Sequence, residues 1–191
     1  MKWWEKTVEY FFVLKHVKID MLVSPLDGTE EKLGDAILSD DNKWVLIEFK
    51  KDKNKLNSEK EKFDDYDKAQ EQLCEKDNHH YLIYGEFNGE FQLKCITYFS
   101  AKERDSIESA LSMGTDIESF GQYIEEFTEL KNSPNDGGGG GLGLSDYSLV
   151  AGVNDNGDII QCMSISDFQQ IKGHDPKPEK RKELKYRSMG R

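Results

Sequence analysis

One apolar run near the middle of the first hundred residues constrains the fold of this 191-residue chain more than any other stretch. Residues 44–50 read WVLIEFK, and a short run rich in β-branched and aromatic side chains is typical of a strand. Because side chains alternate between the two faces of a strand, Glu48 and Lys50 should share one face with Trp44 and Leu46. The carboxylate and the amine then lie about 7 Å apart along that face.

A second short run, residues 35–39, precedes this strand, and the polar residues 40–43 lie between the two. Turn residues between two β-prone runs predict a hairpin. In such a hairpin, Asp35 reaches the same end of the face as Glu48 and Lys50. Two carboxylates can hold a hard cation, and a neighbouring lysine can orient or deprotonate a water molecule.

This arrangement resembles the PD-(D/E)xK nuclease superfamily: Asp35 is followed by twelve residues and then by Glu48-Phe49-Lys50. Gly34 stands where a proline often precedes the aspartate in that superfamily. The resemblance covers about residues 1–100. It implies a restriction-endonuclease-like core made of a helix, a hairpin that carries the acidic residues, a second helix and further strands. It also implies a metal-dependent phosphodiester hydrolase that acts on nucleic acid, DNA in the first place, with Mg²⁺ or Mn²⁺ as cofactor.

Further site residues follow from the resemblance and the helical pattern. Residues 3–15 have an apolar stripe at helical spacing. A glutamate on the first helix of the superfamily often helps to hold the metal, so Glu5 joins Asp35 and Glu48 as an expected metal ligand, with Glu9 as the alternative.

A second helix is predicted over residues 58–76, because Ser58 and Glu61 form a capping-box pattern. Polar residues of this helix commonly lie beside the site in the superfamily. The candidates are Lys68, Gln70 and Gln72, and Gln70 lies nearest the packing stripe of the helix.

The remaining pattern predicts an α/β (or α+β) fold with a central mixed sheet of about five strands flanked by helices. In addition to the hairpin, strands are predicted over residues 17–26, 81–87 and 91–99, the last two joined by an Asn-Gly turn. Adjacent side chains of a strand face opposite ways, so His79 and His80 are expected at the surface rather than on one metal ion.

The C-terminal half divides into a covering region and an appendage. Helices over 101–113 and 117–131 should cover the sheet or form a homodimer contact, which completes a core of residues 1–131. Residues 132–143 contain five consecutive glycines without the lysine and hydroxyl residue of a phosphate loop, and predict a linker or mobile loop. Residues 144–173 predict a β-hairpin and a short helix, and 174–191 form a basic tail.

The charge distribution favours a different class of function. The net charge is −11, and the basic residues from 172 onward leave −16 on the first 171 residues. Nucleic-acid binders usually carry a basic surface. The alternative is therefore a catalytically inactive nuclease-fold protein, such as an inhibitor, an immunity factor or a subunit, that binds a protein through its acidic surface or the hairpin appendage.

Location follows from what the sequence lacks. It contains no apolar run of 18 residues and no signal-peptide pattern at its start, and its three cysteines are scattered. We therefore expect a reduced, cytoplasmic protein without a membrane partner.

Overall fold

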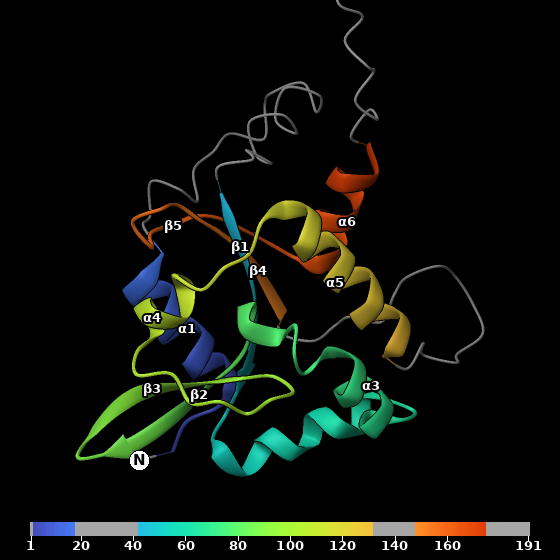
Figure 1. Ribbon diagram of the computed structural model, residues 1–191. Helices are drawn as coiled ribbons and strands as arrows, with labels where there is room; N and C mark the ends of the chain where they lie inside the picture. The colour runs from blue at the N-terminus through green and yellow to red at the C-terminus, as the bar shows by residue number, and fades with distance from the viewer. Residues whose placement is uncertain (1, 18–41, 132–147, 175–191) are drawn as a thin grey trace, which may run out of the picture.

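The computed structural model describes residues 2–17, 42–131 and 148–174. They form a five-stranded mixed sheet in the order β3-β2-β1-β4-β5, with helices on both faces (Figure 1). The strands are β1 (Lys43–Lys50), β2 (His80–Asn88), β3 (Glu90–Thr97), β4 (Ser148–Val153) and β5 (Ile159–Met163). The helices are α1 (Glu5–His16), the 3₁₀ helices η2 (Lys53–Lys62) and η3 (Asp77–His79), α3 (Tyr66–Leu73), α4 (Ile107–Leu111), α5 (Ile117–Leu130) and α6 (Ile165–His174). The α/β class and the five-stranded mixed sheet expected from the sequence are confirmed.

Strand β1 is the central strand. It runs parallel to β2 on one edge and antiparallel to β4 on the other. Seven of its eight residues are buried, because helices cover both faces of the sheet there. This burial explains why the run is almost continuously apolar, as strands covered on both faces are.

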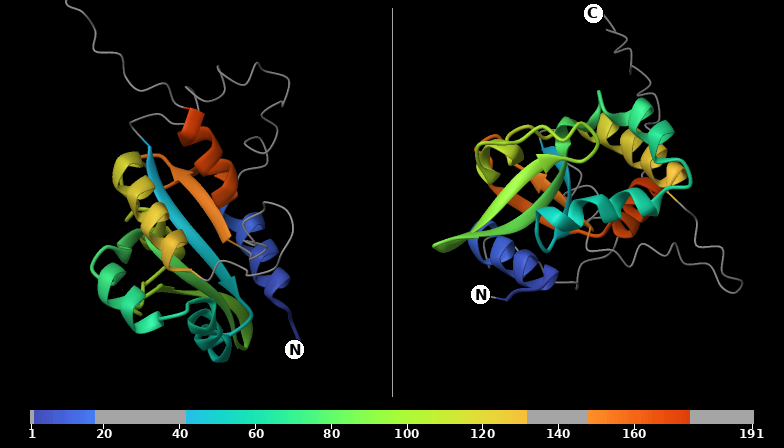
Figure 2. Two further views of the ribbon diagram at one scale, coloured as in Figure 1. Left: turned by 90° about the vertical axis from the view of Figure 1, so that its right-hand side faces the viewer. Right: turned by 90° about the horizontal axis from the view of Figure 1, so that it is seen from below.

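The two faces of β1 contact different helices, as Figure 2 shows. Val45, Ile47 and Phe49 pack against α1 and α4. Trp44 and Leu46 pack on the opposite side against α3, α5 and α6. The alternation predicted for this strand is confirmed, and it places Glu48 and Lys50 on the α5 side.

The hairpin predicted before β1 does not have the neighbour it needs. Residues 35–39 lie outside the described residues, but both edges of β1 are already paired, and β4 lies along Lys43 to Glu48. The predicted pairing of 35–39 with 44–50 falls on residues outside the described part of the chain. The pairing of β1 with β4, a strand 100 residues further along, is non-local, and local pattern does not reveal it.

The predicted C-terminal hairpin forms, but it is no appendage. Strands β4 and β5 pair antiparallel and complete the central sheet beside β1. A lone hairpin is marginal in water, and here it gains two covered faces. Ser164 caps the helix that follows: its hydroxyl accepts from the backbone of Asp167, whose carboxylate accepts from Ser164.

The connection from β1 to β2 differs from the single helix predicted over residues 58–76. A 3₁₀ helix ends at Lys62, Phe63 is extended and bridges to Lys131, and α3 begins only at Tyr66 behind an Asp65 cap. Burial of the Phe63 ring among Tyr98, Phe99 and Phe127 overrides helix propensity here.

Other helix predictions vary in outcome. The helix over 117–131 is confirmed as α5, capped by Asp116. The helix over 101–113 is reduced to α4, which starts only after the Ser106 cap. Of the strand predicted over 17–26, only Val17 belongs to the described residues, and it bridges to Ile159. Within the described ranges, no helix is long and apolar enough to cross a membrane.

The start of β2 is tied to the end of β3 by a buried aspartate. Asp77 is fully buried, and its carboxylate accepts hydrogen bonds from the backbone of Phe99, the backbone of Ser100 and the Ser100 hydroxyl at 2.7–2.8 Å.

Replacing Asp77 with alanine should lower the free energy of unfolding by about 3 kcal/mol, because three donors lose a charged acceptor. Urea unfolding measures the change, with exposed Asp64→Ala as a control expected within about 0.5 kcal/mol of the wild type. Equal midpoints for the two variants would contradict the assigned contacts.

Candidate functional site

A buried group of charged side chains surrounds Glu48 on the α5 face of β1. The Glu48 side chain is only 2% exposed, and each of its oxygens contacts an ammonium group. Lys131, at the C-terminal end of α5, places Nζ 2.9 Å from Oε1, and Lys62, from the end of η2, places Nζ 3.1 Å from Oε2. Groups from three elements therefore meet at one carboxylate, and one of them, Lys131, is 83 residues from Glu48.

Lys50 and Glu59 extend this group along the strand. The Lys50 ammonium forms an ion pair with the Glu59 carboxylate, and both side chains are buried. Glu59 also accepts a hydrogen bond of 2.6 Å from the Tyr98 hydroxyl and lies 2.9 Å from Lys62. We call Glu48, Lys50, Glu59, Lys62 and Lys131 the charged cluster.

Aromatic and imidazole groups close the cluster from the side of β2. His80 is fully buried and stacks on the Tyr98 ring at 4.1 Å between centroids. Its Nδ1 is 2.7 Å from the Tyr123 hydroxyl, and its Nε2 is 4.0 Å from Glu48 Oε1. The expectation that His79 and His80 lie at the surface is wrong, since η3 and the start of β2 carry both of them under α5.

Each lysine of the cluster contacts at least one carboxylate: Lys50 pairs with Glu59, Lys131 with Glu48, and Lys62 with both glutamates. Two buried polar atoms beside Glu48 make no hydrogen bond: His80 Nε2 and the hydroxyl of Ser148, which is the β4 partner of Glu48 in the sheet. Unpaired buried polar atoms cost free energy, and a ligand that hydrogen-bonds to them relieves that cost.

The two glutamates have opposite pKa shifts. Burial acts to raise the pKa of Glu48, but the ammonium groups of Lys131 and Lys62 hold it well below its usual value. Burial and the neighbouring Glu48 charge raise the pKa of Glu59 to about 6. Burial lowers the pKa of His80 well below its usual value, so the imidazole is neutral. At neutral pH, Glu48 is therefore the anionic centre of the cluster. As pH falls, Glu59 takes up a proton before Glu48 does.

The residues predicted for the site are only partly brought together. Glu48 and Lys50 share the cluster, while Asp35 lies outside the described residues. Glu5 and Glu9 belong to α1, which packs on the opposite face of the sheet, and Glu9 pairs with Lys6 at 2.7 Å. The predicted roles of Glu5 and Glu9 beside Glu48 are therefore wrong in this arrangement, because the first helix covers the face that carries Val45, Ile47 and Phe49.

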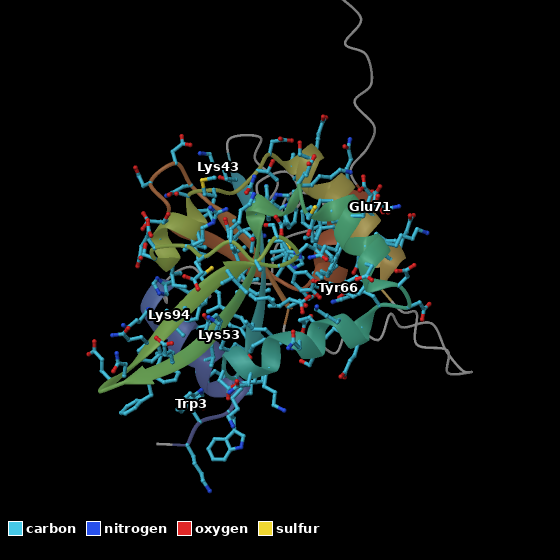
Figure 3. All side chains as sticks on the ribbon, turned by 60° about the horizontal axis from the view of Figure 1, so that its bottom comes forward. Trp3, Lys43, Lys53, Tyr66, Glu71 and Lys94 are labelled. Carbon is cyan, nitrogen blue, oxygen red and sulfur yellow. The ribbon has the colours of Figure 1, made fainter. Side chains whose placement is uncertain are left out.

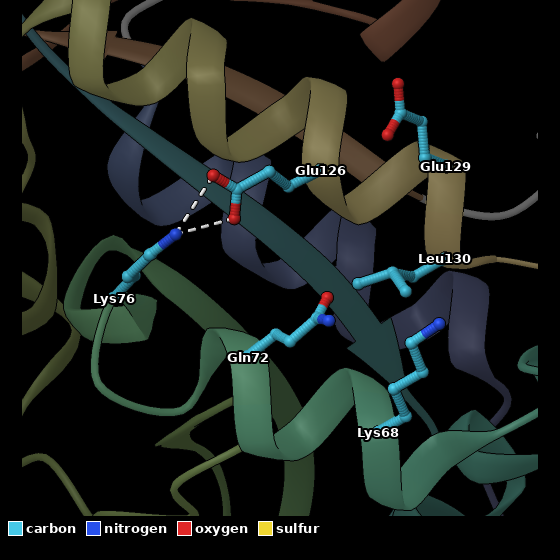
Figure 4. Close-up of a pocket in the computed structure, with 6 residues that line it drawn as sticks. All are labelled: Lys68, Gln72, Lys76, Glu126, Glu129 and Leu130. Carbon is cyan, nitrogen blue, oxygen red and sulfur yellow. Dashed lines mark hydrogen bonds and ion pairs between the residues drawn. The ribbon is translucent and has the colours of Figure 1, made fainter.

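The polar residues of α3 lie near the cluster without joining it. Gln70 donates a 2.8 Å hydrogen bond to the Phe99 backbone and so ties α3 to the end of β3. Lys68 and Gln72 line a hollow of about 470 Å³ between α3 and α5, with the Lys76–Glu126 ion pair at one end (Figure 4). None of the six residues that line this hollow belongs to the charged cluster.

The charged cluster offers donors of the right kind for Mg²⁺ or Mn²⁺, but too few of them. Burial, and after it repulsion by the neighbouring Glu48 charge, raises the pKa of Glu59. A hard cation between two such carboxylates would relieve that repulsion. Among the residues that the structure describes, however, no group of three His, Cys, Asp or Glu side chains could hold a metal ion. Glu48 and Glu59 therefore fit as two ligands of an incomplete set, for which Asp35 was the third residue expected from the sequence.

The sequence did not predict several members of the site. Glu59, Lys62 and Lys131 look like ordinary residues of charged helices, and His80 looks like the polar start of a strand. One available signal was the position of Glu59 in the connection directly after the Glu-x-Lys strand. Lys131 had no local signal, since it is 83 residues from Glu48.

Comparisons with known proteins add no relative. No family model, curated protein or solved structure matches this chain.

The raised pKa of Glu59 predicts a pH-dependent stability. The pKa of Glu59 is about 6 in the folded protein, and the ordinary value is 4.5. Because the folded protein binds this proton more tightly than the unfolded chain does, the protonated carboxyl contributes stability below pH 4.5, and this contribution is lost as pH rises through 6. The unfolding free energy of the wild type, relative to Glu59→Gln, should thus fall by about 2 kcal/mol between pH 4.5 and 7. Urea unfolding across this range measures it. Glu71 is exposed (Figure 3), and the difference in unfolding free energy between the wild type and Glu71→Gln should not change with pH. If the difference between the wild type and Glu59→Gln is also independent of pH, the pKa of Glu59 is not raised by burial.

Proposed function

We propose that the charged cluster is the working site of a metal-dependent phosphodiester hydrolase that acts on nucleic acid. The observation that supports this most is that Glu48 and Lys50 share the α5 face of the central strand, where Lys50 pairs with a second carboxylate, Glu59. Carboxylates with a neighbouring lysine are the groups that cation-assisted attack of water on a phosphodiester requires. The three ammonium groups of the cluster suit a substrate that carries negative charge on every phosphate.

Four members of the cluster have distinct roles in this proposal. Glu48 and Glu59 hold the divalent cation, with Asp35 as the expected third ligand, and the cation supplies neutralisation of the charge that develops on the phosphate. Lys50 orients the attacking water or stabilises the charged transition state. Lys62, whose side chain is 19% exposed, is the most accessible of the three lysines and the first to meet a phosphate from solvent.

The orientation of the central strand also supports the proposal. Trp3 donates a 2.7 Å hydrogen bond to the backbone oxygen of Lys51, so the end of β1 that carries the cluster lies at the Trp3 side of the molecule, away from Lys43 (Figure 3). At this end the Lys62 side chain is 19% exposed, so solvent reaches the cluster there.

A second candidate is the catalytically inactive relative of such an enzyme that binds a protein partner. The observation that favours it is the burial of the cluster: Glu48 and Lys50 are nearly inaccessible, and ammonium groups already contact both oxygens of Glu48. In that case the lysines stand permanently where a cation would bind. The net charge of −11 then serves a basic protein partner.

Cleavage assays separate the two candidates. The purified protein should nick supercoiled DNA or cut RNA with Mn²⁺ or Mg²⁺, and Glu48→Gln and Lys50→Met should each lower the rate at least about 100-fold, because each removes a charge aligned with the reacting phosphate. Agarose gels and a fluorescent oligonucleotide measure the rates.

The matched control is Lys53→Met, which removes an exposed lysine from the same connection without touching the cluster. It should cleave like the wild type. Cleavage that survives both cluster substitutions assigns the activity elsewhere, and a wild type that neither cleaves nor binds Mn²⁺ supports the protein-binding candidate.

A further inference from the structure

We propose that the outward side of α1, together with the tip of the β2–β3 hairpin, binds a second copy of this chain, so that the protein is a symmetric dimer. The residues that carry this inference are Trp4, Tyr10, Leu14 and Phe87, which we call the exposed apolar face. The inference goes beyond the proposed function and does not depend on it.

The exposed apolar face arises because α1 is apolar on two opposite sides. Val8 and Phe12, four residues apart, are fully buried against the sheet. Tyr10 and Leu14, also four residues apart, point outward and are 61% and 80% exposed, and Trp4, just before the helix, is 71% exposed. Helix α1 lies at the outside of the molecule (Figure 2). A surface helix normally turns polar residues to that side, so this side is suited to a partner.

The β2–β3 hairpin continues this face. The Phe91 ring lies edge-on to the rings of Trp3 and Phe11, with centroid distances of 5.4 and 5.0 Å. Phe87 is the β2 partner of Phe91, so its side chain lies on the same side of the hairpin, and it is 44% exposed. Among the residues that the structure describes, four of the five exposed large apolar side chains therefore belong to α1, the residue before it or this hairpin, and the fifth is Met113.

The exposed apolar face is large enough for a dimer contact. A large aromatic side chain presents roughly 150–250 Å², so at these exposed fractions the four side chains together present about 500 Å². Two copies therefore bury about 1,000 Å² of this surface, which is the lower limit for a specific interface. The flanking half-buried rings of Phe11 and Phe91 add to that area.

The charge of this region favours a second copy over a charged partner. Residues 2–16 contain three lysines and two glutamates, whereas the whole chain has a net charge of −11. Lys6 and Glu9 already neutralise each other at 2.7 Å. Two acidic copies repel each other through most of their surface. Their repulsion is smallest where the surface is apolar and nearly neutral, which is at α1.

An antiparallel pair of α1 helices around a two-fold axis at Tyr10 covers this face without requiring a second surface. Tyr10 lies midway between Lys6 and Leu14, so the Tyr10 rings of the two copies meet at the axis. Leu14 of each copy then packs on the methylene groups of Lys6 from the other. The antiparallel arrangement also places the positive end of each helix dipole beside the negative end of the other.

Helix α5, for which the sequence also allowed a dimer contact, has no comparable face. The exposed large apolar side chains of the described residues include none from α5. Its apolar residues are buried in the core of one copy: Phe120, Tyr123, Ile124 and Phe127.

Sedimentation equilibrium of the full chain across micromolar concentrations tests the inference. The wild type should reach twice the 22.0 kDa mass of one chain. Tyr10→Glu and Leu14→Lys should each raise the dimer dissociation constant at least about 100-fold, because an interface anchor is lost twice in a symmetric dimer. Tyr10→Phe keeps the ring and should remain a dimer.

The two-fold axis gives a sharper test with mixed variants. Tyr10→Glu and Tyr10→Lys should each be monomeric alone, because like charges meet at the axis, and their equimolar mixture should form a mixed dimer, because opposite charges meet there. Misfolding does not produce such a restoration. The matched control is Gln122→Glu, which adds the same charge to the exposed side of α5 on the other face of the sheet and should leave the dissociation constant unchanged.

Three outcomes would overturn the inference. The first is a wild type that stays monomeric at the highest concentration. The second is equal dissociation by Gln122→Glu, which would trace the effect to overall charge. The third is a monomer that binds anionic lipid vesicles with a blue shift of tryptophan fluorescence that Trp4→Phe abolishes, which would assign the face to a membrane surface. None of these results bears on cleavage of DNA or RNA, so failure of the dimer is distinct from failure of the hydrolase.

Discussion

The carboxylate of Glu48 lies on the central strand of the sheet, and its removal from water is the constraint on which the surrounding structure depends. An isolated buried carboxylate costs several kcal/mol, and only close cations and hydrogen bonds offset that cost. Lys62 and Lys131 each bring an ammonium group to one oxygen of the carboxylate, and His80 Nε2 lies 4.0 Å from Oε1. The crossover connection and α5 are thus tied to β1 by charge as well as by apolar packing.

The same constraint explains the irregular connection after β1. Glu59 must reach Lys50 and the Tyr98 hydroxyl, while Phe63 must reach an aromatic group that includes Phe127. The chain uses a 3₁₀ helix, an extended residue and a separately capped α3.

A network of this kind is poorly explained by stability alone. Replacing buried ion pairs with well-packed apolar residues is often neutral or stabilising, and strongly shifted pKa values gather at functional sites. The cluster joins a raised pKa at Glu59, a lowered pKa at Glu48 and three buried or half-buried ammonium groups at one strand end. That combination favours a site that handles charged ligands over a core that merely tolerates them.

The sequence by itself determined the elements whose signals are local. The strand at 43–50, the two hairpins around Asn88-Gly89 and Gly157, and helices α1 and α5 all follow from alternation, helical spacing or turn residues. Alternation also placed Glu48 and Lys50 on one face. Local pattern holds this information because each signal lies within about a dozen residues.

Only the tertiary structure decided what lies beside these residues. The pairing of β4 with β1, the burial of both histidines, the placement of α1 on the face opposite Glu48 and the approach of Lys131 join parts of the chain that are far apart in sequence. Such contacts depend on which partners bury the most apolar surface and compensate the buried charge, and these quantities exist only once the whole chain has packed.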